Sequence, residues 1–277
     1  MKQKVSDYIA EYIAQWGIRD VFTVTGGGAM HMNDAFGHHK MLHCTYQHHE
    51  QACAMAAEAY ARLGNKMAAV CVTTGPGATN AITGVLGAWM DSIPMLVFSG
   101  QARYATTVSA SGLPLRSMGV QECNIVPVVK SLTKYAHMIV HPENIRYHLE
   151  KALYLAVNGR PGPVWLDIPL DVQGAVIETD DLKAYDPEEN PEQQPREIKD
   201  ETVEQILDKL QESKRPVLSP GNGVRLAGAH EDFYQLAELL GVPVVTGMSS
   251  VDAIESDHPL FVGRSGGTGT RPGNFAL

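Results

Sequence analysis

Several features that would point to a membrane, a nucleic acid or a secreted scaffold are missing from this sequence. Its apolar runs, such as residues 95–98 (MLVF), are as long as a strand and too short to cross a bilayer. The formal net charge is −9, and no cluster of lysine and arginine forms a basic stripe, which argues against nucleic-acid binding. The N-terminus has no apolar signal core, so we expect a cytoplasmic protein with no membrane partner.

Cysteine is also scarce. Cys44, Cys53, Cys71 and Cys123 have neither metal-ligand nor redox-pair spacing. Each lies among apolar or small residues, a setting typical of buried, reduced thiols. The 11 histidines are scattered and show no metal-ligand spacing either. The sequence therefore predicts no metal site built from its own residues.

What the sequence does contain is a regular alternation of helix and strand patterns. Helices are expected over residues 5–16, 29–36, 50–63, 78–89 and 142–157. Strands are expected over residues 20–24, 42–46, 67–73, 95–99 and 163–168, and residues 128–140 are expected to be extended. Strands that alternate with helices predict an α/β fold with a parallel sheet and right-handed crossovers.

The composition changes after residue 176. Residues 178–200 are rich in Asp, Glu, Pro and Gln, which indicates an exposed linker. Helices over 201–212 and 228–240, with strands over 216–219 and 242–246, then open a second α/β unit. We therefore expect a first domain over residues 1–176, a linker over 177–198 and a partial second domain over 199–277.

The motifs that carry chemistry lie within residues 48–101. They read HHEQA (48–52), YAR (60–62), TTGPGATN (73–80), DSIP (91–94) and FSGQ (98–101). Glu50 enters a helix with few charges, and a Gly/Pro turn between a strand and a helix follows. Such glycines let the backbone approach a ligand closely, but the turn lacks the Lys-Ser/Thr ending of a nucleotide triphosphate loop. From the residues alone, the preferred interpretation of Glu50 is a first-turn glutamate favoured by the helix dipole, and a plain connection between strand and helix is an alternative for the turn.

These motifs resemble the pyrimidine-binding domain of the thiamine-diphosphate enzymes of the acetolactate synthase family, and the resemblance extends over essentially the whole chain. It implies a parallel-sheet pyrimidine-binding domain followed by a truncated, Rossmann-like central domain. It also implies a thiamine-diphosphate-dependent carboligase or decarboxylase, a transferase or lyase, that acts on a 2-oxo acid such as pyruvate. The alternative is a non-catalytic or half-subunit module that assembles with a separate diphosphate-binding chain.

The resemblance assigns roles to particular residues. Glu50 is implied to be the catalytic glutamate that bonds the aminopyrimidine ring and drives its tautomerisation. Thr73, Pro76 and Asn80 belong to the turn that faces the cofactor in this family. His49 matches the family's histidine before the glutamate, although a structural histidine bonded to backbone is the preferred interpretation.

Two further segments match the family with departures. Gly26 and Gly27 end the first strand where the family has a Pro-Gly-Gly turn against the cofactor; here the proline is absent, and a plain tight turn remains an alternative. Gln121 and Glu122 match the family's Phe-Gln-Glu segment near the active site, but Val120 replaces the phenylalanine. A polar surface loop is the alternative for Gln121.

The resemblance implies thiamine diphosphate and Mg²⁺ as cofactors. The family's third domain carries Gly-Asp-Gly followed by Asn-Asn, which hold the metal and the diphosphate, and neither element occurs in these 277 residues. The metal ligands are therefore expected outside this sequence, in a longer protein of which it is a piece. Residues 268–272 (TGTRP) resemble a segment that contacts FAD in some members, but FAD is not the favoured expectation here. A homodimer or higher homo-oligomer is expected, with residues 78–89 at the contact.

Overall fold

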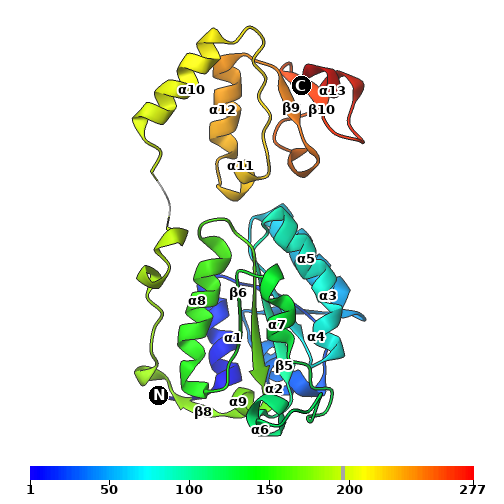
Figure 1. The fold of residues 1–277 in the computed structure, drawn as a ribbon, viewed down its shortest axis with the longest axis vertical. Helices are drawn as coiled ribbons and strands as arrows, with labels where there is room; N and C mark the ends of the chain where they lie inside the picture. The colour runs from blue at the N-terminus through cyan, green and yellow to red at the C-terminus, as the bar shows by residue number, and fades with distance from the viewer. Residues whose placement is uncertain (195–196) are drawn as a thin grey trace. The chain divides into compact units, whose positions relative to one another are not determined.

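The structure is a computed structural model that describes residues 1–194 and 197–277, and it divides into two compact units, Met1–Pro195 and Arg196–Leu277 (Figure 1). The first unit is built on a six-stranded sheet with strand order β3-β2-β4-β5-β7-β6. Its strands are β2 (Asp20–Thr23), β3 (His43–Tyr46), β4 (Ala69–Val72), β5 (Met95–Gln101), β6 (Tyr135–Met138) and β7 (Pro163–Pro169). Every neighbouring pair is parallel, so the predicted α/β fold with a parallel sheet is confirmed.

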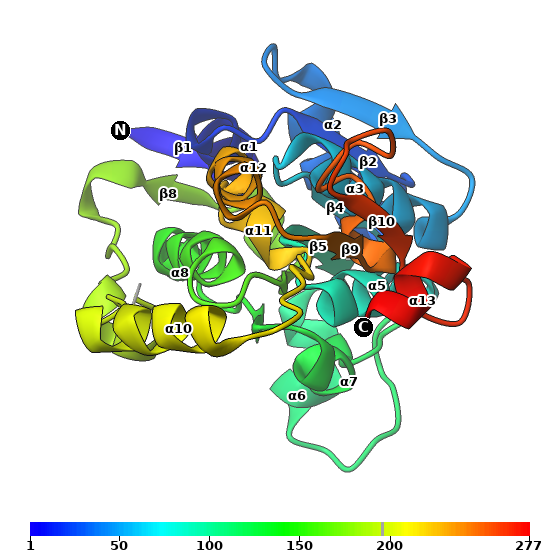
Figure 2. The same ribbon diagram turned by 90° about the horizontal axis from the view of Figure 1, so that it is seen from above.

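Helices cover both faces of this sheet (Figure 2). One face carries α1 (Val5–Trp16), α2 (Met30–His38), α8 (Ile145–Val157) and α9 (Leu170–Gly174). The other carries α3 (Glu50–Gly64), α4 (Pro76–Asn80), α5 (Ile82–Asp91) and α7 (Ile125–Val129). Because both faces are covered, β4, β5 and β7 are buried along their whole length, which explains their nearly continuous apolar sequences.

The helices begin and end where local chemistry favours it. In α1, Val5, Ile9 and Ile13 share the buried stripe, and Gly17 closes the helix in the left-handed conformation. The helix predicted over residues 78–89 is divided into α4 and α5, with Ala81 between them. The predicted helices over residues 5–16 and 50–63 match α1 and α3 closely.

Two segments differ from the sequence prediction. Residues 125–132 are helical, in α7 and a 3₁₀ turn, so the extended conformation predicted from residue 128 is wrong for residues 128–132, and the backbone becomes extended at Thr133. Ile125 and Val129, one helical turn apart, are both fully buried, and this burial outweighs the β-branched character of the segment.

Residues 177–194, predicted from composition as a linker, lie against the first unit. The strand β8 (Val176–Glu178) pairs antiparallel with β1 (Lys2–Lys4), which the sequence did not predict. Leu182 and Tyr185 are buried, and Glu189 accepts a hydrogen bond from the Tyr147 hydroxyl. A few apolar side chains within an acidic segment are enough to anchor it, and an averaged composition does not show them.

The second unit is a smaller α/β arrangement. Its strands β9 (Val244–Thr246) and β10 (Phe261–Arg264) are parallel, and its helices are α10 (Asp200–Glu212), α11 (Gly223–Leu226), α12 (His230–Leu240) and α13 (Arg271–Ala276). The strand predicted over residues 216–219 is reduced to a single bridge between Leu218 and Val244. Throughout the described part of the chain, every helix is too short or too polar to span a bilayer.

Candidate functional site

The predicted site residues lie in loops that follow different strands of the parallel sheet. Gly26 follows β2, Glu50 follows β3, Thr73 follows β4, and Gln121 lies in the long connection after β5. Since these strands are parallel, their carboxyl ends meet at one edge, where ligands bind in open α/β sheets. The fold therefore explains how residues up to 95 positions apart can share one site.

Glu50 and Asn80 meet directly. The Asn80 side-chain amide donates to Glu50 Oε2 at 3.0 Å. The other carboxyl oxygen, Oε1, faces the backbone of Gly77, because a Cβ placed at Gly77 would lie 3.2 Å from it. Glu50 is partly exposed, so its carboxyl group is both oriented and accessible.

The turn before α4 depends on Gly75. This residue has φ of +57°, a conformation that favours glycine, and a Cβ there would lie 2.0 Å from the Gln121 carbonyl oxygen. Pro76 then occupies the first position of α4, where its missing N–H is tolerated. The turn and the Gln121 backbone are consequently in close contact. The Gln121 side chain is exposed and its φ is also +57°.

Thr73 connects the β2 and β4 turns. Its hydroxyl accepts a hydrogen bond from the Gly28 N–H at 3.1 Å. A Cβ at Gly26 would lie 2.4 Å from Thr73 Cβ, so only glycine fits there. Gly27 is exposed, and no described residue comes within 4 Å of its would-be Cβ. An open hollow of about 360 Å³ beside these turns is lined by Thr25, Gly26, Gly27, Met30 and Asn33.

Glu122 organises the loop that carries Gln121. Its carboxylate accepts hydrogen bonds from the backbone N–H groups of Val108 at 2.7 Å, Met118 at 2.8 Å and Gly119 at 2.9 Å. Burial acts to raise the pKa of this carboxyl, but the three N–H donors outweigh it, and the pKa lies below the usual value. Beside it, Val120 is strongly exposed. The sequence motif identifies Glu122 but does not predict that its carboxylate binds the loop backbone.

His49 has a structural position. Its Nδ1 accepts a hydrogen bond from the Gln51 N–H at 3.1 Å, so it caps the start of α3. This contact supports the interpretation of a histidine bonded to backbone. Among the described residues, no group of three or more His, Cys, Asp or Glu side chains is arranged to hold a metal ion.

Strands β5 and β7 carry a buried polar network that the sequence did not predict. Asp167 in β7 is fully buried and accepts hydrogen bonds from the Ser99 hydroxyl at 2.5 Å and the Gln101 amide at 3.1 Å. Trp165 donates its indole N–H to Ser99 at 2.8 Å. Burial raises the pKa of Asp167 to about 7, and the two donors oppose this only in part. The one sequence feature that could have indicated this network is the aspartate at position 167 within an otherwise apolar strand.

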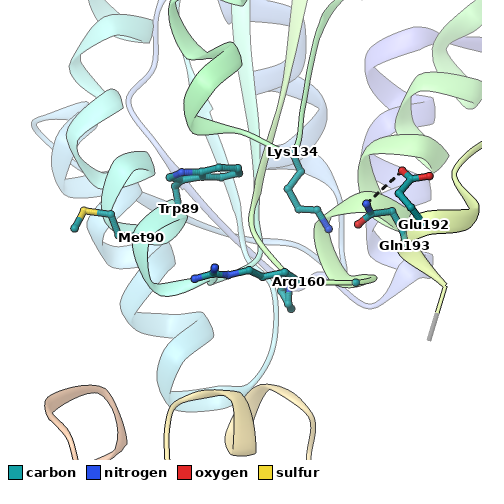
Figure 3. Close-up of a pocket in the computed structure, with 8 residues that line it drawn as sticks. Trp89, Met90, Lys134, Arg160, Glu192 and Gln193 are labelled. Atoms are coloured by element: carbon teal, nitrogen blue, oxygen red, sulfur yellow. Dashed lines mark hydrogen bonds between the residues drawn. The ribbon is translucent and has the colours of Figure 1, made fainter. Parts of the chain in front are cut away.

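A separate pocket of about 390 Å³ lies at the opposite edge of the sheet (Figure 3). Lys134, just before β6, and Arg160, just before β7, reach into it beside Trp89 of α5. Burial lowers the pKa of Lys134 to about 8, against the opposing effect of Glu192. Lys134 donates to the Asn158 carbonyl. The pocket is at the amino ends of the strands and does not belong to the site around Glu50.

Comparison with known proteins agrees with this geometry. Residues 3–123 match the thiamine pyrophosphate enzyme N-terminal TPP binding domain, and residues 203–277 match the thiamine pyrophosphate enzyme central domain. The chain thus belongs to the thiamine pyrophosphate enzymes. Every predicted site residue falls within the first match.

Several acetolactate synthases are similar to this chain. Acetolactate synthase 2, chloroplastic, of Zea mays is 34% identical over 282 residues, which cover 99% of this chain and 42% of the relative. The acetolactate synthase large subunit of Lactococcus lactis is 32% identical over 98% of this chain and 46% of the relative. The probable acetolactate synthase large subunit of Methanocaldococcus jannaschii is 32% identical over 99% of this chain and 45% of the relative. The chain spans less than half the length of each.

Proposed function

We propose that this chain supplies the pyrimidine side of the thiamine diphosphate site in a carboligase or decarboxylase that acts on a 2-oxo acid such as pyruvate. The observation that carries this proposal is the oriented, accessible Glu50 carboxyl group in a chain of this family. Support for the substrate class comes from the similar proteins, which are named acetolactate synthases. Val120 stands where that group has a phenylalanine, so the acceptor substrate is left undefined.

The residues present fit the pyrimidine part of the cofactor. Gly26 and Gly77 both pack tightly against Thr73, since a Cβ at either position would lie 2.4 Å or 2.7 Å from its side chain, and an open hollow lies beside the Gly26 turn. Asn80 holds one oxygen of Glu50 and leaves the other directed along the Gly77 backbone. When bound, thiamine diphosphate supplies a carbon nucleophile that adds to the 2-oxo carbonyl and accommodates the negative charge left by decarboxylation.

In this proposal the chain's own residues orient the pyrimidine ring and hold one proton beside a ring nitrogen. Glu50 hydrogen-bonds a pyrimidine ring nitrogen and shares a proton with it, which favours the reactive tautomer. Asn80 fixes the carboxyl group, and Gly75 and Pro76 set the turn beside it. Mg²⁺ and the diphosphate are assigned to residues outside this sequence.

The proposal is tested with the assembled enzyme, meaning this chain together with a diphosphate-binding domain. Pyruvate is supplied with Mg²⁺, and carbon dioxide release and acetolactate formation are measured with and without thiamine diphosphate. We expect turnover that requires the cofactor. Turnover of a 2-oxo acid that is unaffected by removing the cofactor would contradict the proposal.

The chain alone is expected to bind thiamine diphosphate weakly. Most of the affinity for a diphosphate comes from Mg²⁺ bridging and helix-end N–H groups, and this sequence is not expected to supply them. Titration calorimetry with Mg²⁺ should show no micromolar binding. A micromolar dissociation constant for the isolated chain would show that the diphosphate site is present after all.

A symmetric dimer with residues 78–89 at the contact is also expected. Exposed apolar side chains lie on α5 and on α3, which packs against it, namely Met55, Leu63, Leu86, Trp89 and Met90. Burying such surface contributes roughly 25 cal/mol per Å². We therefore expect Leu86→Asp to shift the chain toward monomer in sedimentation equilibrium.

The matched control is Leu239→Asp, at an exposed leucine of α12 in the second unit, which should leave the association unchanged. A chain that is monomeric at micromolar concentration would refute the expected dimer. An equal effect of both substitutions would place the contact elsewhere.

A further inference from the structure

Gln101 lies at the point where the site loops meet the sheet. It is the last residue of β5 and is 1% exposed. Its amide nitrogen donates to the Cys123 carbonyl at 2.8 Å and to Asp167 Oδ2 at 3.1 Å. Its amide oxygen accepts from the Thr74 hydroxyl at 2.7 Å and from the Ala102 N–H at 3.0 Å. Both N–H protons of the amide are used, and its oxygen accepts twice.

The partners of this amide belong to the two loops that carry the candidate site. Thr74 directly precedes Gly75, which begins the turn that leads to Asn80 and its bond with Glu50. Cys123 comes two residues after Gln121. The two loops also touch each other, since a Cβ at Gly75 would collide with the Gln121 carbonyl oxygen. Gln101 therefore bonds both sides of a tight backbone contact.

The amide is itself anchored to the next strand. Asp167 in β7 accepts a hydrogen bond from the amide through Oδ2, whereas Ser99 bonds the other carboxyl oxygen, Oδ1. A buried amide whose donors and acceptor are all paired has one orientation, because a flip would set donor against donor toward the Ala102 N–H and acceptor against acceptor toward the Cys123 carbonyl. A side chain of equal size without the amide could not make these bonds.

We infer that Gln101 is a positioning residue that fixes the Gly75–Asn80 turn and the Gln121 loop relative to each other. Its effect on catalysis rests on the proposed function, whereas its hold on the two loops does not. Gln101 acts on the cofactor region only through these backbone segments. Asp167 supports it by fixing the amide from the opposite side.

Hydrogen exchange followed by mass spectrometry tests the hold on the loops in the cofactor-free chain. In Gln101→Met, peptides spanning residues 73–81 and 118–124 should exchange about tenfold faster or more, since buried partners lose their hydrogen bonds. Thr74→Val removes only the hydroxyl donor, so it should accelerate residues 73–81 more than 118–124. It also keeps the test decisive if Gln101→Met does not fold.

The matched control is Ser99→Ala. Ser99 lies in the same strand and the same buried network, but it bonds Asp167 and Trp165 rather than either loop. We expect both loop peptides to exchange within about twofold of wild type. Unchanged loop exchange in Gln101→Met, or equal acceleration in Ser99→Ala, would overturn the inference.

The assembled enzyme then tests the consequence for catalysis. Gln101→Met should slow exchange of the thiamine diphosphate C2 proton by about tenfold or more and lower kcat, with a smaller change in the KM for pyruvate. Ser99→Ala should leave that exchange rate close to wild type. Faster loop exchange with unchanged C2-proton exchange would overturn the positioning role. An assembled wild-type enzyme without cofactor-dependent turnover would instead reject the proposed function, and the loop result would still decide the structural part.

Discussion

Glu50→Gln in the assembled enzyme is expected to lower turnover by about 10²–10⁴-fold, the range typical of losing a general acid–base group. The amide has nearly the same shape and can keep the contact with Asn80, but it cannot share a proton with a ring nitrogen. The exchange rate of the thiamine diphosphate C2 proton, followed by NMR, should fall by a similar factor. Folding should be little affected, because a first-turn glutamate contributes only about 0.3–1 kcal/mol through the helix dipole.

Glu143→Gln is the matched control for this substitution. Glu143 is also a first-turn glutamate, in the 3₁₀ segment that leads into α8, and it lines a hollow with Val176 and Glu178 rather than with any candidate site residue. Its substitution should leave turnover unchanged. Near-normal C2-proton exchange in Glu50→Gln would remove Glu50 from the mechanism and leave it as a helix-start residue.

Asp167→Asn is expected to change how stability depends on pH. The folded chain keeps Asp167 protonated up to about pH 7, whereas an unfolded chain loses that proton near pH 4. Between these values the folded state binds more protons, so the stabilising contribution of Asp167 is fully present below about pH 4 and is lost as pH rises toward 7. Each pH unit in this window corresponds to about 1.4 kcal/mol, or about 4 kcal/mol in total.

Urea unfolding of the wild type and of Asp167→Asn at several pH values measures this effect. The asparagine side chain imitates the protonated acid and cannot titrate, so the unfolding free energy of the variant should rise relative to that of the wild type by about 2 kcal/mol between pH 5 and pH 7. A difference in unfolding free energy that stays constant over this range would show that Asp167 does not keep its proton in the folded chain.

Much of the fold was predictable because local signals agree with tertiary packing. The start of α3 at Glu50 and the glycine that ends α1 follow from sequence, since capping and periodicity act over a few residues. The parallel sheet follows from the alternation of elements. Residues 125–132 could not be predicted this way, because burial of Ile125 and Val129 decided their conformation.

The candidate site also contains residues that the sequence predicts and residues that it does not. Glu50 and Asn80 were selected from motifs, and their hydrogen bond follows once the strands are parallel. The role of Gln101 was not predictable, because its partners Thr74, Cys123 and Asp167 are 22 to 66 residues away and meet only in the folded chain. Sequence periodicity ends the predicted strand at residue 99, two residues before Gln101, and gives no sign of the four hydrogen bonds that Gln101 makes.

A structure of the assembled enzyme with Mg²⁺ and thiamine diphosphate tests most directly whether this chain provides the pyrimidine side of the site. We predict that the Glu50 carboxyl group lies within about 2.6–3.2 Å of a pyrimidine ring nitrogen. The ring should lie between the Gly26 turn and the Gly75–Asn80 turn. A cofactor whose pyrimidine ring is bound by other residues, with Glu50 bonded only to Asn80 and solvent, would contradict it.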